Sequence, residues 1–240
     1  MTNDTKLLVA FDFDHTVVDG NTDTWITKAA PGGDIPKALK DSYVTGHWTQ
    51  YMGRVLQHLH SEGVDASALQ QVLQGLPYTA GMEQLFQHLA QCAAHCIILS
   101  DSNTQFIEWI LQDRGHSSLF SKVYTNPARV SDQGQLLLGP YHSHSCPTCP
   151  VNMCKRLILQ QHMQQHVLRS QAPYCRVAYV GDGSNDLCPA QSLGPTDIVF
   201  VRAGFALDKL LQKPEVACSV QAEIVRWQTG HDILQRLQAL

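Results

Sequence analysis

The chain has 240 residues, of which 44% are hydrophobic, so it can bury a full core as one large domain or as one domain with an insertion. Its net charge is −4 without any run of lysines or arginines, which argues against nucleic acid and anionic membranes as partners. We expect neither a signal peptide at the polar N-terminus nor a membrane span. Eight cysteines without a secretory signal favour reduced thiols and a cytoplasmic location.

The first predicted element is a strand over residues 7–11, because a short continuous apolar run is typical of a strand buried on both faces. Asp12 and Asp14 follow it, and in extended geometry alternate side chains point the same way. Two like charges on one face cost energy unless a cation or a shared proton relieves them. Because open α/β sheets bind ligands at the carboxyl ends of their strands, this position predicts chemistry or metal binding.

The segment from Gly20 to Gly75 is predicted to be helical throughout, which indicates an insertion between the first and second strand–helix units. Asn21 and Thr22 can cap its first helix, and Pro36 suits the first turn of the next. We interpret its aromatic and aliphatic stripe as packing rather than as a ligand contact. That stripe has helical spacing: Trp48, Tyr51, Met52, Val55, Leu56 and Leu59. The predicted helices cover about 24–29, 36–43, 48–59 and 67–73.

From Thr79 onward, short apolar strands alternate with helices, and this alternation predicts an α/β fold with a central parallel sheet covered by helices on both faces. The predicted strands are 96–99, 122–125, 176–180, 198–201 and 224–227, with a further apolar segment at 136–138 after a polar turn. The predicted helices are 82–89, one that ends at 112, 152–169, 207–212 and one that begins near 231.

Polar residues suited to phosphate chemistry follow three of these strands, and a lysine lies near the start of a helix. They are Asp12, Asp14, Ser100, Asp182, Asp186 and Lys155. A lysine at a helix start is unfavourable against the helix dipole unless it faces an anion. A hydroxyl, a lysine, backbone N–H groups and clustered carboxylates are typical of a phosphate cradle, and oxygen ligands favour Mg²⁺ over zinc.

This set, in this order, resembles the haloacid dehalogenase superfamily, with its DxDxT motif, strand-end serine, lysine and GDGxND motif. The resemblance implies a three-layer Rossmann-like core in which Asp12 attacks phosphorus and Asp14 acts as general acid and base. It also implies that Ser100 and Lys155 hold the phosphoryl oxygens. Mg²⁺ would be held by the side chains of Asp12 and Asp182 and by the backbone carbonyl of Asp14. Two further residues, Asn185 and Asp186, would support the site.

The stretches FDFDHTVVDGNTD, LSDSN, HSHSCPTCPVNMCK and YVGDGSNDLCP resemble the phosphoethanolamine/phosphocholine phosphatase family over nearly the whole chain. NTDTWI, GHWTQYMGRV and FIEWIL resemble its pyridoxal phosphate phosphatase branch. The resemblance implies a core of residues 1–20 and 76–240, a helical cap of residues 21–75, and substrate contacts by Asp23 and Asp101. Carboxylates beside a phosphate repel the ligand unless it carries a cation. In the alternative interpretation neither residue contacts substrate: Asp23 is an ordinary acid in the first turn of a helix, and Asp101 is part of the N-terminal cap of the next helix.

The loop before Lys155 carries an H-x-H-x-C-x-x-C-x₄-C cluster of possible metal ligands, made of His142, His144, Cys146, Cys149 and Cys154. Because a second CxxC pair is missing, we interpret the cluster as a structured loop that positions Lys155 rather than as a metal site. The family that the chain resembles shares these cysteines. We interpret the other cysteines as small packed apolar groups.

The leading hypothesis is a Mg²⁺-dependent phosphatase that acts on a small-molecule phosphate ester, and pyridoxal 5′-phosphate is the substrate we favour. Phosphoethanolamine or phosphocholine is the alternative if the site around Asp23 is too narrow for a pyridine ring. A phospho-acceptor switch, similar to a bacterial receiver domain, is a hypothesis from another class. A switch phosphorylates itself and stops, whereas an enzyme turns over. The sequence patterns do not indicate an oligomeric state.

Overall fold

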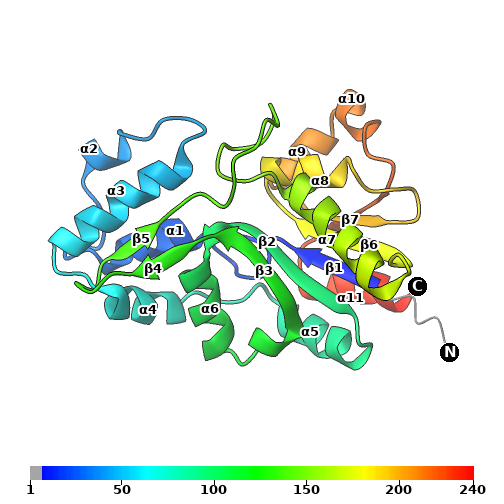
Figure 1. Cartoon of the computed structure of the whole chain (residues 1–240), viewed down its shortest axis with the longest axis horizontal. Coiled ribbons are helices and arrows are strands. Elements are labelled where there is room, and N and C mark those ends of the chain that lie inside the picture. Colours follow the sequence, from blue (N-terminus) through cyan, green and yellow to red (C-terminus); the bar gives the residue numbers. More distant parts are fainter. Residues whose placement is uncertain (1–6) are drawn as a thin grey trace.

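The computed structural model describes residues 7–240. Within this range six parallel strands form one sheet, with β1 and β6 at its centre and the chain order growing outward from them in both directions (Figure 1). From one edge to the other the strands are β3 (Phe120–Asn126), β2 (His95–Asn103), β1 (Leu7–Phe11), β6 (Arg176–Gly181), β7 (Ile198–Arg202) and β8 (Glu223–Trp227). The order reverses between β1 and β6, which makes their carboxyl ends the switch point where α/β sheets bind ligands.

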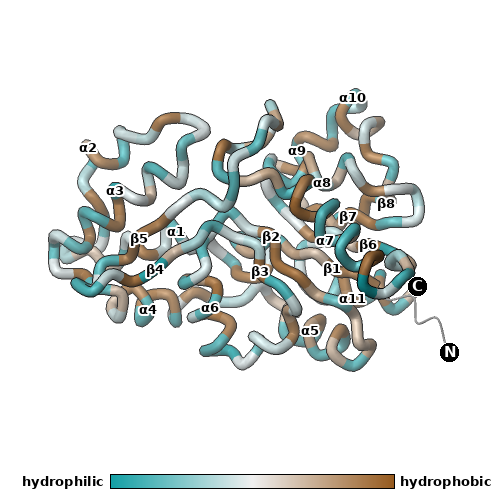
Figure 2. Tube along the Cα trace, in the orientation of Figure 1, coloured by the Kyte–Doolittle hydropathy of each residue, from teal (hydrophilic) through white to brown (hydrophobic). Residues whose placement is uncertain are grey.

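The two faces of the sheet are covered by different helices, so the predicted three-layer α/β core is confirmed. Alternate residues of β1 serve the two layers: Val9 and Phe11 pack on one face, and Leu8 and Ala10 pack on the other. Figure 2 shows hydrophobic segments along β1 and β2 in the middle of the molecule. The first face carries α5 (Met82–Gln91), α6 (Thr104–Asp113) and α11 (Gly230–Gln238), and the second carries α7 (Lys155–Ser170) and α9 (Ala206–Leu211).

Residues 21–75 contain helices and no strand in this structure, as the sequence predicts. They are α1 (Thr22–Trp25), the 3₁₀ helix η1 (Ile26–Ala29), α2 (Lys37–Lys40), α3 (Trp48–Ser61) and α4 (Ala66–Gln74). A later antiparallel hairpin, β4 (Ala128–Val130) and β5 (Leu136–Leu138), lies against α3 (Figure 1), and the Ala66 N–H donates to the Gly134 carbonyl at 3.2 Å. The division into a core and a cap stays a proposal, and this hairpin belongs spatially to the cap side.

The apolar stripe of α3 packs into the same buried cluster as the α5 and α6 face of the sheet. Met52, Val55 and Leu59 are fully enclosed, in agreement with the packing interpretation. Trp48, at the start of the stripe, is only partly buried and its indole N–H points elsewhere, to a carboxylate described below. The stripe therefore holds the cap side on the core, and one of its members also reaches the candidate site.

Several element boundaries differ from the sequence patterns. The long helix α7 begins at Lys155 and not at 152, because Cys154 has the extended backbone of an N-cap residue. Strand β2 continues through Asn103, beyond the apolar run. Four short elements were not predicted because they are too short to show a helical periodicity in the sequence. They are the helices α8 (Leu187–Ala190) and α10 (Pro214–Ala217) and the 3₁₀ turns η2 (Ser117–Leu119) and η3 (Ser184–Asp186).

No helix within residues 7–240 is long and apolar enough to cross a membrane.

Candidate active site

Asp12 and Asp182 lie at neighbouring strand ends at the switch point of the sheet. Strands β1 and β6 pair in parallel with Phe11 opposite Val180, and each strand is followed directly by its aspartate. The Asp12 N–H continues the ladder by donating to the Val180 carbonyl at 2.8 Å. Both carboxylates are buried. Parallel pairing therefore brings together two acids that are 170 positions apart in the chain.

Lys155 enters this site from the start of α7, with a side chain that is 1% exposed. Its Nζ lies 2.9 Å from Oδ2 of Asp12 and 2.7 Å from Oδ1 of Asp186. Burial by itself lowers the pKa of Lys155, but the charges of Asp12 and Asp186 outweigh it and raise this pKa above its ordinary value. Lys155 is therefore a permanent positive charge beside the Asp12 carboxylate.

Asp186 is fully buried and both of its oxygens already have partners. Oδ1 accepts hydrogen bonds from Lys155 and from the Tyr179 hydroxyl at 2.6 Å. Oδ2 accepts the N–H groups of Asp182 at 3.0 Å and Gly183 at 2.8 Å. A Cβ on Gly181 would lie only 2.5 Å from Oδ2, so this tight turn requires glycine. Asp186 thus fixes the lysine and the loop after β6.

The carboxylates at this end of the site fit a hard divalent cation. Oxygens of Asp12, Asp182 and Asp186 lie within 4.8 Å of one another. Burial, followed by the charge of Asp186, raises the pKa of Asp182 to about 7. Burial also raises the pKa of Asp12 well above its usual range, in spite of Lys155. One lysine does not balance three buried acids, and carboxylate oxygens are the ligands that Mg²⁺ prefers.

Asp14 lies on the side of the site that faces α1. The backbone N–H of Thr22 donates to its Oδ1 at 3.0 Å, and the Thr22 hydroxyl donates to its Oδ2 at 3.1 Å. Burial, followed by the charge of Asp23, raises the pKa of Asp14 to about 7. A carboxyl group with this pKa can both give and accept a proton near neutral pH.

Ser100 and Thr16 border the same strand ends. Ser100 is buried in β2, next to β1, and its Oγ accepts the Ser102 N–H at 3.2 Å. A register irregularity between Ser100 and Asn103 redirects the end of the strand, as bulges do beside active sites. The Thr16 hydroxyl lies 3.4 Å from Oδ1 of Asp182 and links the DxDxT turn to the loop after β6.

Asp23 and Asp101 differ in how their carboxylate oxygens are hydrogen-bonded. Asp23 is 3% exposed; its Oδ2 accepts the Trp48 indole N–H at 2.6 Å, whereas its Oδ1 has no hydrogen-bond partner within residues 7–240. Burial raises the pKa of Asp23 to about 7, and the charge of Asp101 acts in the same direction. Both oxygens of Asp101 accept side-chain amides, from Asn152 at 2.6 Å and from Asn185.

Five residues of the site are absent from the sequence prediction because only tertiary contacts reveal them. Thr22 holds Asp14, Trp48 holds Asp23, and Tyr179 holds Asp186. Asn152 holds Asp101, and Arg202 donates to the His15 carbonyl in the turn after β1 at 2.6 Å. Two of them carried a sequence signal of another kind: Thr22 was a candidate cap, and Trp48 belonged to the stripe interpreted as packing. Neither signal indicates a partner for a carboxylate.

The chain is similar to known phosphatases over nearly its whole length. The sequence profile of the family described as "Putative Phosphatase" matches residues 7–240. A pyridoxal phosphate phosphatase, PHOSPHO2 of Mus musculus, is 40% identical over 238 residues, which covers 98% of each chain. The phosphoethanolamine/phosphocholine phosphatase of Homo sapiens is 38% identical over 237 residues, which covers 97% of this chain and 88% of the human one.

Solved structures of a phosphoserine phosphatase have the same fold. Its apo form superposes with a TM-score of 0.57 at 18% identity, over 96% of this chain and 98% of that one. A phospho-aspartyl intermediate analogue of the enzyme gives 0.58 at 17% identity, over 97% and 99%. At such identities the likeness establishes the fold alone. Because the family profile spans all the described residues and the relatives align over nearly their full length, the chain belongs to this phosphatase family.

Proposed function

We propose that this chain is a Mg²⁺-dependent phosphatase that hydrolyses a small phosphate monoester through an aspartyl phosphate on Asp12. The observation that carries the proposal is the buried Asp12 carboxylate, held 2.9 Å from the Lys155 ammonium beside Asp182 at the switch point of the sheet. A nucleophile, a fixed cation and a cluster of oxygen ligands in one buried place are what phosphoryl transfer to a carboxylate requires.

In the first half of the proposed reaction, an oxygen of Asp12 attacks phosphorus and the ester oxygen leaves. Asp14, protonated in a fraction of molecules near neutral pH because its pKa is about 7, donates its proton to that leaving oxygen. Lys155 and Ser100 hold the phosphoryl oxygens, and this charge stabilisation supplies much of the rate enhancement. The products are the free alcohol and a phosphorylated Asp12.

In the second half, the ionised Asp14 accepts a proton from the water that attacks phosphorus. The bond between phosphorus and the Asp12 oxygen breaks, inorganic phosphate is released, and both aspartates return to their starting states. Thr22 keeps the Asp14 carboxyl in place through both halves by its two hydrogen bonds.

When bound, Mg²⁺ would supply positive charge that favours the ionised forms of Asp12 and Asp182 and reduces their repulsion of the phosphate. The side chains of Asp12 and Asp182 and the backbone carbonyl of Asp14 would hold it. Asp186 has both oxygens occupied by other donors, so its part is to position Lys155 and the loop.

The substrate is inferred from Asp23. Its buried, unpartnered Oδ1 is a hydrogen-bond acceptor in need of a donor, and an ionised Asp23 favours a cationic one. A protonated pyridine or a primary ammonium has an N–H to give, whereas a trimethylammonium group has none. Trp48, which contacts Tyr43 and Tyr51, places aromatic surface beside Asp23. We therefore propose pyridoxal 5′-phosphate as the preferred substrate, in line with the relative from Mus musculus, and phosphoethanolamine as the alternative substrate.

The test is a panel of phosphate monoesters assayed with Mg²⁺ and compared by kcat/KM, which measures differential transition-state binding. We expect repeated phosphate release, with pyridoxal 5′-phosphate preferred, phosphoethanolamine below it and phosphocholine lowest. Release of one alcohol per chain, with the phosphate retained on Asp12 and no further turnover, would instead identify a phospho-acceptor switch. A preference for phosphocholine would overturn the role given to Oδ1 of Asp23.

The eight free cysteines support a cytoplasmic location for the enzyme.

A further inference from the structure

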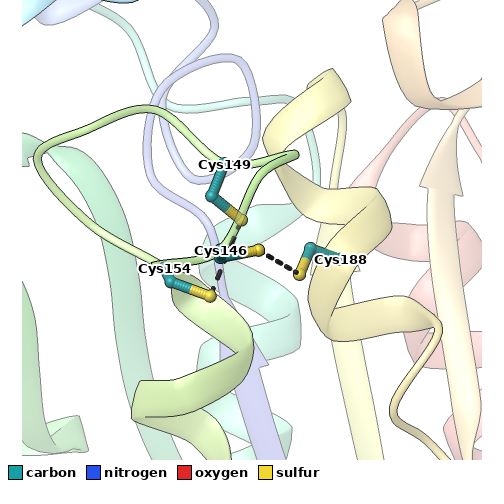
Figure 3. A group of neighbouring side chains, drawn as sticks. All are labelled: Cys146, Cys149, Cys154 and Cys188. Carbon is teal, nitrogen blue, oxygen red and sulfur yellow. Dashed lines mark hydrogen bonds between the residues drawn. The ribbon is translucent and has the colours of Figure 1, made fainter. Parts of the chain in front are cut away.

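Four cysteine thiols that are not part of the proposed active site point toward one another, as Figure 3 shows. Three of them, Cys146, Cys149 and Cys154, come from the loop before α7, and Cys188 comes from α8. Their four sulfur atoms lie within 4.8 Å of one another. The sequence pattern supplies only the first three, which is why the missing second pair argued against a metal. Cys188 is not a separately packed apolar residue, as interpreted from the sequence, but the fourth member of this cluster.

The spacing of the thiols fits a tetrahedral metal site. A Zn–S bond of about 2.3 Å places the sulfurs of a tetrahedral tetrathiolate about 3.8 Å apart. The structure gives 3.8 Å between Sγ of Cys146 and Cys188 and 3.6 Å between Sγ of Cys149 and Cys154. Disulfide sulfurs lie about 2.05 Å apart, so these contacts are not disulfide bonds. All eight cysteines, which lie within the described residues, are free.

The two histidines of the same motif have other partners and brace the loop. Nε2 of His142 accepts the Cys154 N–H at 3.0 Å. Nδ1 of His144 accepts the Cys146 N–H at 3.1 Å, and its Nε2 donates to the Pro150 carbonyl at 2.8 Å. Both rings therefore fix the backbone of residues that carry the thiols. Such contacts orient the ligands of a metal without joining them.

We propose that Cys146, Cys149, Cys154 and Cys188 bind one structural zinc ion. Four thiolates and no free position make a closed site of the structural kind, and soft sulfur ligands select zinc over Mg²⁺. The site is distinct from the carboxylate cluster, whose donors are all oxygen. Its occupancy therefore does not depend on the proposed phosphatase chemistry.

The zinc site would join the two segments that build the phosphate-binding end of the active site. Cys154 directly precedes Lys155, and Cys188 follows Asp186 by two residues. The Lys155 ammonium and the Asp186 carboxylate are themselves 2.7 Å apart. One ion would hold the start of α7 against the segment after β6. The cysteine-rich loop before α7 would then position Lys155, as interpreted from the sequence, and would do so through the bound metal.

The first experiment measures metals in the whole native chain. The protein is purified under reducing conditions, saturated with zinc in the presence of Mg²⁺, dialysed and analysed by inductively coupled plasma mass spectrometry. We expect about one zinc ion per chain. A chain that retains less than about a tenth of that amount, or that holds iron in its place, would overturn the proposal. So would a mass that shows two disulfides formed among the four cysteines under reducing conditions.

The second experiment assigns the ligands. Cys149→Ser and Cys188→Ser are expected to lower the retained zinc at least about tenfold, whereas Cys92→Ser and Cys218→Ser, exposed cysteines outside the cluster, are expected to retain it. Equal losses in both sets would refute the assignment. If the cluster variants do not fold, Co²⁺ substitution of the native chain decides the matter, because a tetrathiolate site gives intense sulfur-to-cobalt absorption and an oxygen site does not. Asp12→Asn should keep its zinc, which separates this result from a failure of the proposed function.

Discussion

The two ends of the active site differ in how their buried charges are balanced. At the phosphate end, formed by Asp12, Lys155, Asp182 and Asp186, the lysine pairs with two carboxylates and Asp186 has a full set of donors. At the cap-side end, formed by Asp14, Asp23 and Asp101, no lysine or arginine within residues 7–240 forms an ion pair with these acids. One carboxylate oxygen there, Oδ1 of Asp23, has no hydrogen-bond partner in the described part of the chain.

Under the proposed function, the protein balances the buried charges of the phosphate end by itself, whereas the substrate balances those of the cap-side end. A buried carboxylate without a partner costs free energy, so it persists where binding later supplies the missing group. The phosphate end carries its own cation because every phosphate monoester presents the same group there. The cap-side end has no such cation among the described residues, which supports the proposal that it selects a leaving group with a positive N–H.

The largest expected effect is at the phosphate end. Asp12→Asn keeps the side-chain shape but removes the carboxylate that we propose as the nucleophile, so kcat should fall by at least about 10⁴-fold. Steady-state phosphate release measures this, and circular dichroism confirms that the fold persists. Asp132→Asn, at an exposed position on the hairpin, is the matched control. Retained activity in the Asp12 variant would show that the nucleophile is misassigned.

Lys155→Met tests whether the phosphate end is balanced by this one lysine. The variant leaves Asp12 and Asp186 buried without their cation, and breaking a buried pair in this way costs about 3–5 kcal/mol in the free energy of unfolding. Urea denaturation near pH 7 measures the loss. Lys209→Met, an exposed lysine on α9, should change stability by less than about 0.5 kcal/mol. A similar small change at Lys155 would mean that the pair does not stabilise the fold.

The pH dependence of stability tests the cap-side end. Burial raises the folded-state pKa of Asp23 from 3.8 to about 7, so the folded chain holds this proton more tightly than the unfolded chain does. The resulting stability is complete below pH about 4 and is lost as the pH rises through about 7. Asp23→Asn removes this loss and keeps an acceptor for Trp48. Its stability relative to the native chain should therefore rise by roughly 2–3 kcal/mol between pH 5 and 8 without Mg²⁺ or substrate.

Denaturation curves of both chains at several pH values measure this difference. A difference in unfolding free energy that stays constant with pH would show that Asp23 is ionised throughout this range and is already balanced. Asp19→Asn is a useful comparison, because that exposed acid has its own partner in Arg202.

The smallest expected effect concerns substrate discrimination. Asp101→Asn removes a negative charge near the cap-side end while leaving an amide that can still pair with Asn152. We expect kcat/KM for a cationic substrate such as phosphoethanolamine to fall about tenfold more than that for a neutral ester of similar size, because only the cation loses a charge contact. Equal losses on both substrates would contradict the charge-matching argument.

The sequence by itself determined that Asp12 and Asp182 meet at one edge of the sheet. Asp12 and Asp182 each follow an apolar run that is long enough only for a buried strand, and parallel strands end at one edge of a sheet. Local patterns therefore placed residues from distant motifs in one site. The alternation of strands and helices likewise determined the α/β fold, because periodicity is a local property of the chain.

Only the tertiary structure decided which side chains complete the site. Trp48 reaches Asp23 across 25 positions, Asn152 reaches Asp101, and Cys188 joins three thiols of a loop more than 30 positions earlier. Such contacts depend on how helices and loops pack, and no spacing rule encodes the distance between two side chains on different elements. The sequence predicted a chain with acids for phosphate chemistry, and packing determined which of their oxygens have partners among the described residues.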